Sequence, residues 1–105
     1  MHQVAERATE LHAARLLTAQ AAARLDSRQT ADESVRVAKT YAAEAARRMA
    51  ETTVQLHGAQ GGVAGKAPEF LYRASRLGLI AAVPTEIHRV QIARAVLERW
   101  GKQAA

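Results

Sequence analysis

The segment Val54-Gln55-Leu56-His57-Gly58-Ala59-Gln60-Gly61-Gly62 separates two helical patterns and decides how this 105-residue chain folds. Before it, apolar residues or threonine recur at alternating spacings of three and four, at Val35, Ala38, Ala42, Ala45, Met49, Thr52 and Leu56. That spacing places all seven on one side of a helix. Gly58 follows where a helix usually ends in a left-handed residue. We therefore predict a helix over residues 31–57, followed by a glycine-rich loop from Gly58 to Ala67.

The remaining sequence predicts three more helices and no strand. Residues 3–25 consist of strong helix formers, with Val4, Ala8, Leu11, Thr18, Ala22 and Leu25 on one line that only Arg15 interrupts. A short helix is expected from Pro68 to Gly78, with Phe70, Leu71, Ala74 and Leu77 facing inward. After Pro84, Thr85 is predicted to cap a last helix whose apolar face is Ile87, Val90, Ala93, Leu97 and Trp100.

These patterns predict an all-α fold, a single domain over residues 1–105. We expect an antiparallel, up-down helical bundle with three long helices and one short helix. The second helix is rich in alanine on its apolar side, so a neighbouring helix can approach closely and bulkier side chains have to fill the space opposite. Three long helices leave one groove of a four-helix bundle unfilled, and an apolar groove of that size is rarely left open to water. We therefore expect an oligomer.

Composition narrows the class of protein. Without cysteine, the chain forms no disulfide and no thiolate zinc site. The amino terminus carries charges where a signal peptide needs an apolar run, and the longest apolar stretch is too short to span a bilayer, so we expect a cytoplasmic protein away from membranes. The net charge of +5 raises nucleic acid as a partner, but the basic residues are scattered and aromatic residues make up only 4%, too few for a base-stacking platform.

Generic catalytic patterns are absent. No two histidines have the spacing of metal ligands, and no serine has a nearby histidine with a carboxylate to orient it. The glycine-rich segment also lacks the strand and helix context of a nucleotide-binding loop. It can still present backbone amides to a phosphate or a ribose, and Gln55 can add a side-chain amide. A plain flexible loop is the alternative.

Three segments, Val54–Gly62, Leu71-Tyr72-Arg73 and Thr85–Arg94, taken in this order and at this spacing, resemble the C-terminal helical domain of the acyl-CoA dehydrogenases. The resemblance implies a flavoprotein fold. In that family the first segment reads Gln-x-x-Gly-Gly-x-Gly and contacts the ADP half of FAD, often the FAD of a neighbouring subunit. The implied cofactor-binding residues here are Gln55, Gly58, Ala59 and Gly61. Ala59 replaces the second glycine of the pattern, which narrows the room for the cofactor.

The third segment bears on catalysis. The family pattern Ile-Tyr-Glu-Gly-Thr-Ser-Glu-Ile-Gln-Arg corresponds to Ile80-Ala81-Ala82-Val83-Pro84-Thr85-Glu86-Ile87-His88-Arg89. In the family, the first Glu of this pattern abstracts the α-proton of the acyl-CoA while the flavin takes hydride from the β-carbon. Ala82 occupies that position, and a methyl group accepts no proton, so no catalytic residue is assigned. Glu86 does match the pattern, and we count it with the cofactor-binding residues.

The resemblance implies an oxidoreductase domain that acts on CH–CH bonds but lacks its base. The first helix of the family domain and the other family domains are absent from residues 1–105. We therefore expect the chain to need a partner, either a second copy or an acyl-CoA dehydrogenase-type subunit, to complete a site for FAD and acyl-CoA. The alternative is a non-enzymatic helical oligomerisation module that has lost flavin binding. A third possibility is a pocket around Ala82 with a different chemistry, although no residue pattern supports it. A fourth is nucleic-acid binding, which only the net charge supports.

Overall fold

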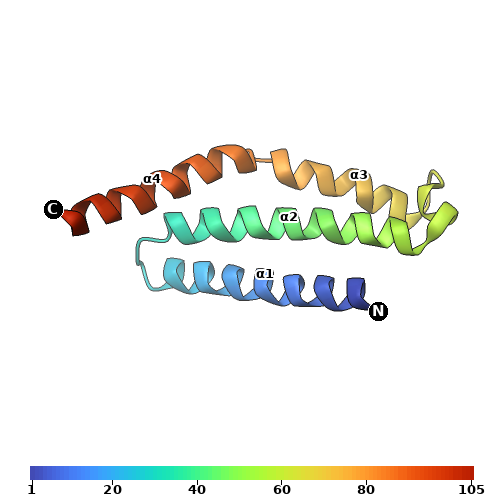
Figure 1. The fold of residues 1–105 in the computed structure, drawn as a ribbon, viewed down its shortest axis with the longest axis horizontal. Coiled ribbons are helices and arrows are strands. Elements are labelled where there is room, and N and C mark those ends of the chain that lie inside the picture. The colour runs from blue at the N-terminus through green and yellow to red at the C-terminus, as the bar shows by residue number, and fades with distance from the viewer.

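Four α-helices and one short 3₁₀ helix make up the computed structural model, which describes residues 1–105 (Figure 1). They are α1 (His2–Asp26), α2 (Asp32–Leu56), the 3₁₀ helix η1 (Gly58–Gly62), α3 (Ala67–Ile80) and α4 (Thr85–Ala104). The α-helices have 25, 25, 14 and 20 residues, so the expected all-α fold with three long helices and one short helix is confirmed. None of them combines the length and the apolar composition that a membrane-crossing helix needs.

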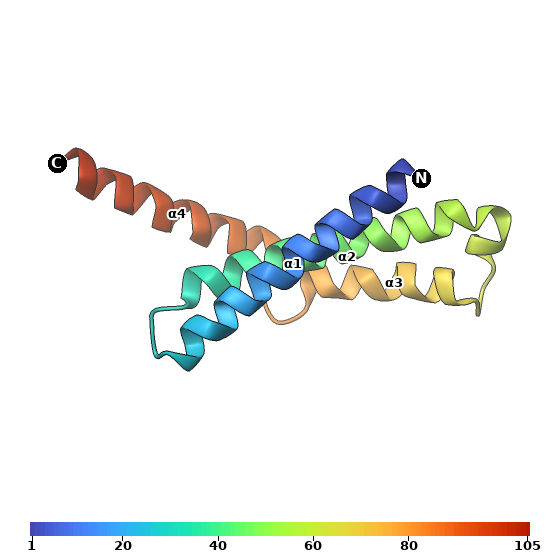
Figure 2. The ribbon, with the colours of Figure 1, turned by 90° about the horizontal axis from the view of Figure 1, so that it is seen from below.

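The central element is α2, which contacts α1, α3 and α4. Figure 1 shows α1 antiparallel to α2 on one side, with α3 and α4 following one another end to end along the other side. In that view α4 continues past the start of α2, and the turned view in Figure 2 shows it diverging from the α2 axis. The molecule is therefore elongated, with extents of 57 × 27 × 23 Å.

Alanine accounts for more than half of the buried residues. The buried apolar side chains are Ala14, Ala21, Ala31, Ala38, Ala45 and Ala50. Only ten of the 105 residues are buried at all. Because alanine contributes a single methyl group, this interior supplies little hydrophobic free energy. Its advantage is geometric, since small side chains let neighbouring helix backbones approach α2 closely.

The apolar line predicted for residues 3–25 lies beside the contact with α2 rather than in it. The shielded positions of α1 are Arg7, Glu10, Ala13, Ala14, Leu17 and Ala21, whereas Val4 and Leu25 remain 55% and 58% exposed. The predicted lines of both helices instead border an apolar groove of about 310 Å³, lined mainly by Thr18, Ala21, Ala22, Leu25, Val35, Ala38 and Ala42. The apolar lines of α1 and α2 are therefore only partly covered within the chain.

The inward faces predicted for the last two helices are wrong. In α3, Phe70, Leu71 and Leu77 are all at least half exposed. In α4, the predicted face points to solvent, and Thr85 and His88 are buried in its place. Hydrophobic periodicity identifies the side of a helix that benefits from leaving water, but it does not identify what covers that side. Within one chain, nothing covers these two faces.

The structure refines the predicted helix ends. Gly58 has a φ of +56° just beyond α2, which confirms the left-handed stop. The expected loop after it is wrong in its first half, because Gly58–Gly62 forms a 3₁₀ helix. The predicted stop at Gly78 is also wrong, since α3 continues to Ile80. Thr85 is the first residue of α4 rather than its cap, and no side chain caps that helix.

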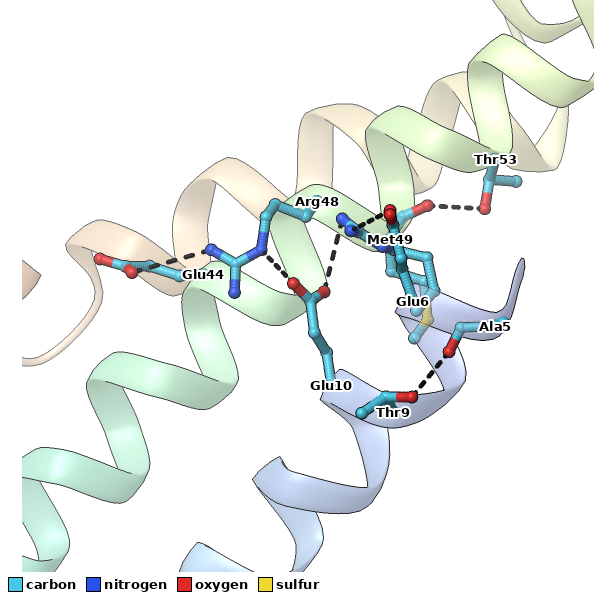
Figure 3. Close-up of polar contacts among 9 residues, drawn as sticks. Ala5, Glu6, Thr9, Glu10, Glu44, Arg48, Met49 and Thr53 are labelled. Carbon is cyan, nitrogen blue, oxygen red and sulfur yellow. Dashed lines mark hydrogen bonds and ion pairs between the residues drawn. The ribbon is translucent and has the colours of Figure 1, made fainter. Parts of the chain in front are cut away.

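Ion pairs fix how the helices lie against each other. Arg48 of α2 is 2.8 Å from Glu10 of α1, and it also lies 3.9 Å from Glu44 on its own helix (Figure 3). Glu44 in turn pairs with Arg89 of α4. A chain of opposite charges therefore links three helices across α2. We expect directional contacts of this kind to favour one register of an alanine interface that small side chains alone leave loosely determined.

Candidate functional site

The glycine-rich turn at the end of α2 collects four of the five predicted cofactor-binding residues. Gln55 lies in the last turn of α2, and Gly58, Ala59 and Gly61 belong to η1. Gln55 and Ala59 are exposed, and the side-chain amide of Gln55 makes no hydrogen bond within the chain. The turn therefore offers a free side-chain amide next to the backbone of η1, where the chain reverses direction after α2.

The glycines of this turn serve different physical purposes. A Cβ atom on Gly61 would lie 2.3 Å from the carbonyl oxygen of Val54 and 2.9 Å from its Cα atom, because η1 folds back against the last turns of α2. Packing within the chain therefore explains this glycine without any ligand. Around Gly58 and Gly62, by contrast, a Cβ atom would meet nothing within 4 Å. Their main chain is open to approach from outside.

One basic side chain lies beside the turn, and a second follows on α3. Lys66 donates a hydrogen bond to Gln60 of η1, which places its ammonium group beside the main chain of the turn. Arg73 of α3 pairs with Glu69 at 2.5 Å and is 69% exposed. The carboxylate of Glu69 also accepts a hydrogen bond of 3.3 Å from the amide of Gly65. The only acid in this set is thus already paired, and the local charge suits an anionic group such as a phosphate.

The connection between α3 and α4 holds the position that corresponds to the catalytic base. Ala82 is exposed and has a φ of +63°, a left-handed conformation that an L-residue adopts only at a cost. The next residue, Val83, accepts a hydrogen bond of 2.8 Å from the Lys39 ammonium group of α2. Glu86 is exposed and forms no ion pair within the chain. This connection therefore carries an exposed methyl group at the position for which the resemblance predicts a base.

The predicted site residues fall in two places rather than one. The 14-residue helix α3 separates the turn from Glu86, which at 1.5 Å per residue is about 20 Å. The structure therefore groups Gln55, Gly58, Ala59 and Gly61, and leaves Glu86 apart. No group of three or more histidine, aspartate or glutamate side chains gathers in a way that could hold a metal ion.

Sequence reasoning missed the role of Lys39. Its side chain spans from α2 to the α3–α4 connection, 44 residues further along the chain. The available signal was a single lysine directly after Ala38, beside the alanine line of α2. That signal is weak, because a long amphipathic side chain beside a packed face usually extends to solvent.

Comparison with known proteins identifies relatives of the whole arrangement. The family model for the acyl-CoA dehydrogenase C-terminal domain matches residues 1–97. A 3-(aryl)acrylate reductase from Clostridium sporogenes is 33% identical over 96 residues, which cover 91% of this chain and 26% of the relative. Subunit CarC of the caffeyl-CoA reductase–Etf complex from Acetobacterium woodii is 30% identical over 96 residues, with 91% and 25% covered.

A solved structure gives the same result for the fold. One chain from the structural work on the electron transferring flavoprotein of Acidaminococcus fermentans and flavin-based electron bifurcation superposes with a TM-score of 0.88 at 26% identity. The superposition covers 91% of this chain and 25% of that chain. This chain therefore spans about a quarter of the length of each protein that it matches.

Proposed function

The chain belongs to the acyl-CoA dehydrogenase family, and on that premise we propose that it supplies the Gln55–Gly61 turn to a FAD molecule held together with another chain. The observation that carries the proposal is the turn itself. It combines a free side-chain amide at Gln55, open main chain at Gly58, and the positive charge of Lys66 next to it. Each of these groups suits the phosphates and ribose of a dinucleotide.

The turn fits this role in part. The Gln55 amide can both donate and accept hydrogen bonds, and the backbone near Gly58 and Gly62 permits close approach. Gly61 offers no cavity, because the carbonyl group of Val54 occupies that space. When FAD is bound, its ring system exchanges hydride with a carbon–carbon bond of the substrate. The contribution of this chain is to bind and orient the other end of the cofactor.

We also propose that the chain does not provide the base of the reaction. Ala82 stands at the position that the family resemblance assigns to the base, and its methyl group accepts no proton. A partner chain then has to supply the remaining walls of the site and the group that exchanges the α-proton, which would donate that proton in the reductive direction and accept it in the oxidative direction. The two curated relatives are named as reductases of an aryl acrylate and of caffeyl-CoA. Acids or thioesters with a double bond next to the carbonyl group are therefore the substrates that we propose for the assembly.

The name of one relative also suggests the class of partner. CarC is a subunit of a complex with Etf, and the matching solved structure comes from work on an electron transferring flavoprotein. We propose that this chain likewise works in a complex with flavoprotein subunits. That assembly, and not the isolated chain, would carry the oxidoreductase activity.

Nuclear magnetic resonance of the ¹⁵N-labelled chain tests the cofactor proposal even if binding is weak. Titration with FAD should shift the amide signals of Gln55, Gly58 and Ala59, and ADP should reproduce these shifts whereas FMN should not. Gln55→Ala should reduce them, whereas the control Gln20→Ala, an exposed glutamine on α1, should leave them unchanged. If the chain is folded and the amide signals of the turn do not shift at millimolar FAD, the proposal is contradicted.

A second candidate function is a helical oligomerisation module without flavin. The observation in its favour is Gly61, because the packing of η1 against Val54 accounts for this glycine without any ligand. Such a module would show no FAD-dependent shift in the turn but would still associate through its apolar faces. The titration therefore separates the two functions.

A further inference from the structure

The connection between α3 and α4 changes direction at a single residue. Ala81 and Pro84 both have extended backbone, with φ −58° and ψ 141° at Ala81 and φ −55° and ψ 144° at Pro84. Between them, the amide of Val83 donates a hydrogen bond of 2.9 Å to the carbonyl oxygen of Ala81. This bond closes a three-residue turn, which we call the Ala82 turn (residues 81–83). Ala82 has a φ of +63°, and a three-residue turn with a positive φ at its centre is the rare, strained form.

The side chain of Ala82 does not explain this conformation. It is exposed, and a methyl group forms no hydrogen bond to the nearby main chain, as the side chain of asparagine or aspartate would. Strained backbone persists only where the surrounding structure holds it. A contact from another part of the chain is therefore needed to keep the Ala82 turn in place.

Lys39 of α2 supplies such a contact. The connection lies alongside α2 (Figure 1), and the Nζ atom of Lys39 donates a hydrogen bond of 2.8 Å to the carbonyl oxygen of Val83. Lys39 also borders the apolar groove between α1 and α2, next to Ala38 and Ala42. A lysine stem gains from covering apolar surface while its charged end reaches a polar partner. The groove thus favours the side-chain position from which the ammonium group meets the connection.

The bond from Lys39 has no substitute among the other hydrogen bonds of the connection. The amide of Ala81 donates to Leu77, and the carbonyl oxygen of Pro84 accepts from Ile87 and His88, so these bonds extend α3 and α4. None of them joins residues 81–84 to α2. Because the donor from Lys39 is charged, its bond is stronger than one between neutral groups.

We infer that Lys39 is a positioning residue, whose ammonium group holds the Ala82 turn in its strained and exposed conformation. The inference rests on the proposed function in one respect, since position 82 belongs to the substrate site only through the family resemblance. In the assembly, Lys39 then sets where the main chain of the connection lies relative to the substrate. A turn tied to a helix fixes such a position more closely than a free loop does.

Nuclear magnetic resonance of the ¹⁵N,¹³C-labelled chain tests the tie directly. The amide proton and the Hα atom of one residue lie closest together at positive φ, so the Overhauser effect between them should be strong at Ala82. Lys39→Met keeps an unbranched apolar stem but removes the donor, and this Overhauser effect should weaken as Ala82 relaxes. Lys39→Arg, which restores a charged donor, should recover it. A strong effect at Ala82 in Lys39→Met would overturn the inference.

The matched control is Lys66→Met. It removes the ammonium group that donates to Gln60, on the glycine-rich turn, and should leave the Ala82 signals unchanged. If both lysine substitutions weakened the effect at Ala82 equally, the loss of any lysine would be sufficient and the positioning role of Lys39 would be wrong. Circular dichroism of each variant checks that the helices are retained.

A double-mutant cycle tests the same link through the folding equilibrium. In the unmodified chain, Ala82→Gly should raise the folding equilibrium constant roughly two- to fivefold, because glycine adopts a positive φ without strain. In the Lys39→Met background the strain is already relieved, so Ala82→Gly should give no gain or a loss, owing to the entropy that glycine adds to the unfolded chain. Urea denaturation measures all four chains. An equal gain in both backgrounds would contradict the role of Lys39.

The FAD titration separates this inference from the cofactor proposal. Lys39→Met should leave the FAD-induced shifts of Gln55 and Gly58 unchanged, because the 14-residue helix α3 lies between the connection and the glycine-rich turn. If no chain responds to FAD but Lys39→Met still weakens the Ala82 signal, the cofactor proposal is wrong and the role of Lys39 stands. If Lys39→Met abolishes shifts that the unmodified chain shows, the substitution disturbs the whole chain, and the local role of Lys39 is overturned.

Discussion

At Gly61 the backbone leaves no space for a side chain, although the residue has an ordinary backbone conformation. The limit is set by Val54, whose carbonyl oxygen lies where a Cβ atom would be. Ala82 presents the opposite situation, with open space around it and a strained backbone at φ +63°. At Gly61 a neighbouring residue therefore limits which side chain fits, whereas at Ala82 the backbone conformation sets the limit.

Gly61→Ala should lower the free energy of unfolding by about 2–4 kcal/mol, because the new methyl group forces η1 away from α2. Urea denaturation followed by circular dichroism measures the change. The control is Gly62→Ala, where nothing lies within 4 Å of the added Cβ atom and the effect should stay within about 0.5 kcal/mol. Equal effects of the two substitutions would show that η1 does not pack as described.

Ala82→Gly should stabilise the chain by roughly 0.5–1 kcal/mol. The left-handed conformation costs an L-residue about 1–2 kcal/mol, which exceeds the entropy that glycine adds to the unfolded chain. At the neighbouring Ala81, with a φ of −58°, only the entropy remains, so Ala81→Gly should destabilise by up to about 1 kcal/mol. Thermal unfolding of both variants should give shifts of opposite sign.

Among the helices, α2 determines the arrangement because every other helix packs against it. Its alanine side permits close approach, and Arg48 reaches Glu10 of α1 (Figure 3). Glu44 pairs with Arg89 of α4. Lys39 adds a third connection by binding the carbonyl oxygen of Val83. Helix position therefore depends on a few polar contacts superimposed on a smooth apolar surface.

A double-mutant cycle measures the least exposed of the inter-helix ion pairs. Glu10→Gln and Arg48→Met should show a coupling free energy of about 0.5–1 kcal/mol, since the two side chains are 19% and 36% exposed and 2.8 Å apart. The pair Asp32–Arg36 on the surface of α2 is the control. Its separation of 3.8 Å and the 78% exposure of Asp32 predict a coupling of about 0.3 kcal/mol or less. A coupling for Glu10–Arg48 no larger than this would exclude a role for the pair in setting the register.

As a whole, the molecule has an interior of small side chains and an exterior with much of its larger apolar surface. Its six buried apolar residues are all alanine, while the tryptophan and most of the leucines are on the outside. A single chain of this kind gains little from folding alone. Association should therefore account for a substantial part of its stability.

Thermal unfolding should consequently depend on protein concentration. For a dimer, each tenfold increase in concentration should raise the stability by about 1.4 kcal/mol, and the melting temperature should rise with it. A concentration-independent melting temperature for the unmodified chain would contradict this prediction.

The sequence by itself determined the helices, because helix propensity, three-four periodicity and the left-handed stop at Gly58 are local properties. It also determined the family, through the order and spacing of the segments around Gln55, Tyr72 and Glu86. The composition of the glycine-rich turn was likewise visible in the sequence, since its residues are neighbours in the chain.

Only the tertiary structure decided which faces are covered. The periodicity of α4 correctly marks an apolar side, yet that side points to solvent, because burial depends on what lies opposite. The tertiary structure also explains why position 61 needs a glycine, because η1 folds back onto Val54 there. It likewise identifies the hydrogen-bond partner of Lys39, which is 44 residues away along the chain. Local sequence patterns report the preference of each segment for water or for burial, whereas contacts between distant segments are fixed only when the whole chain is packed.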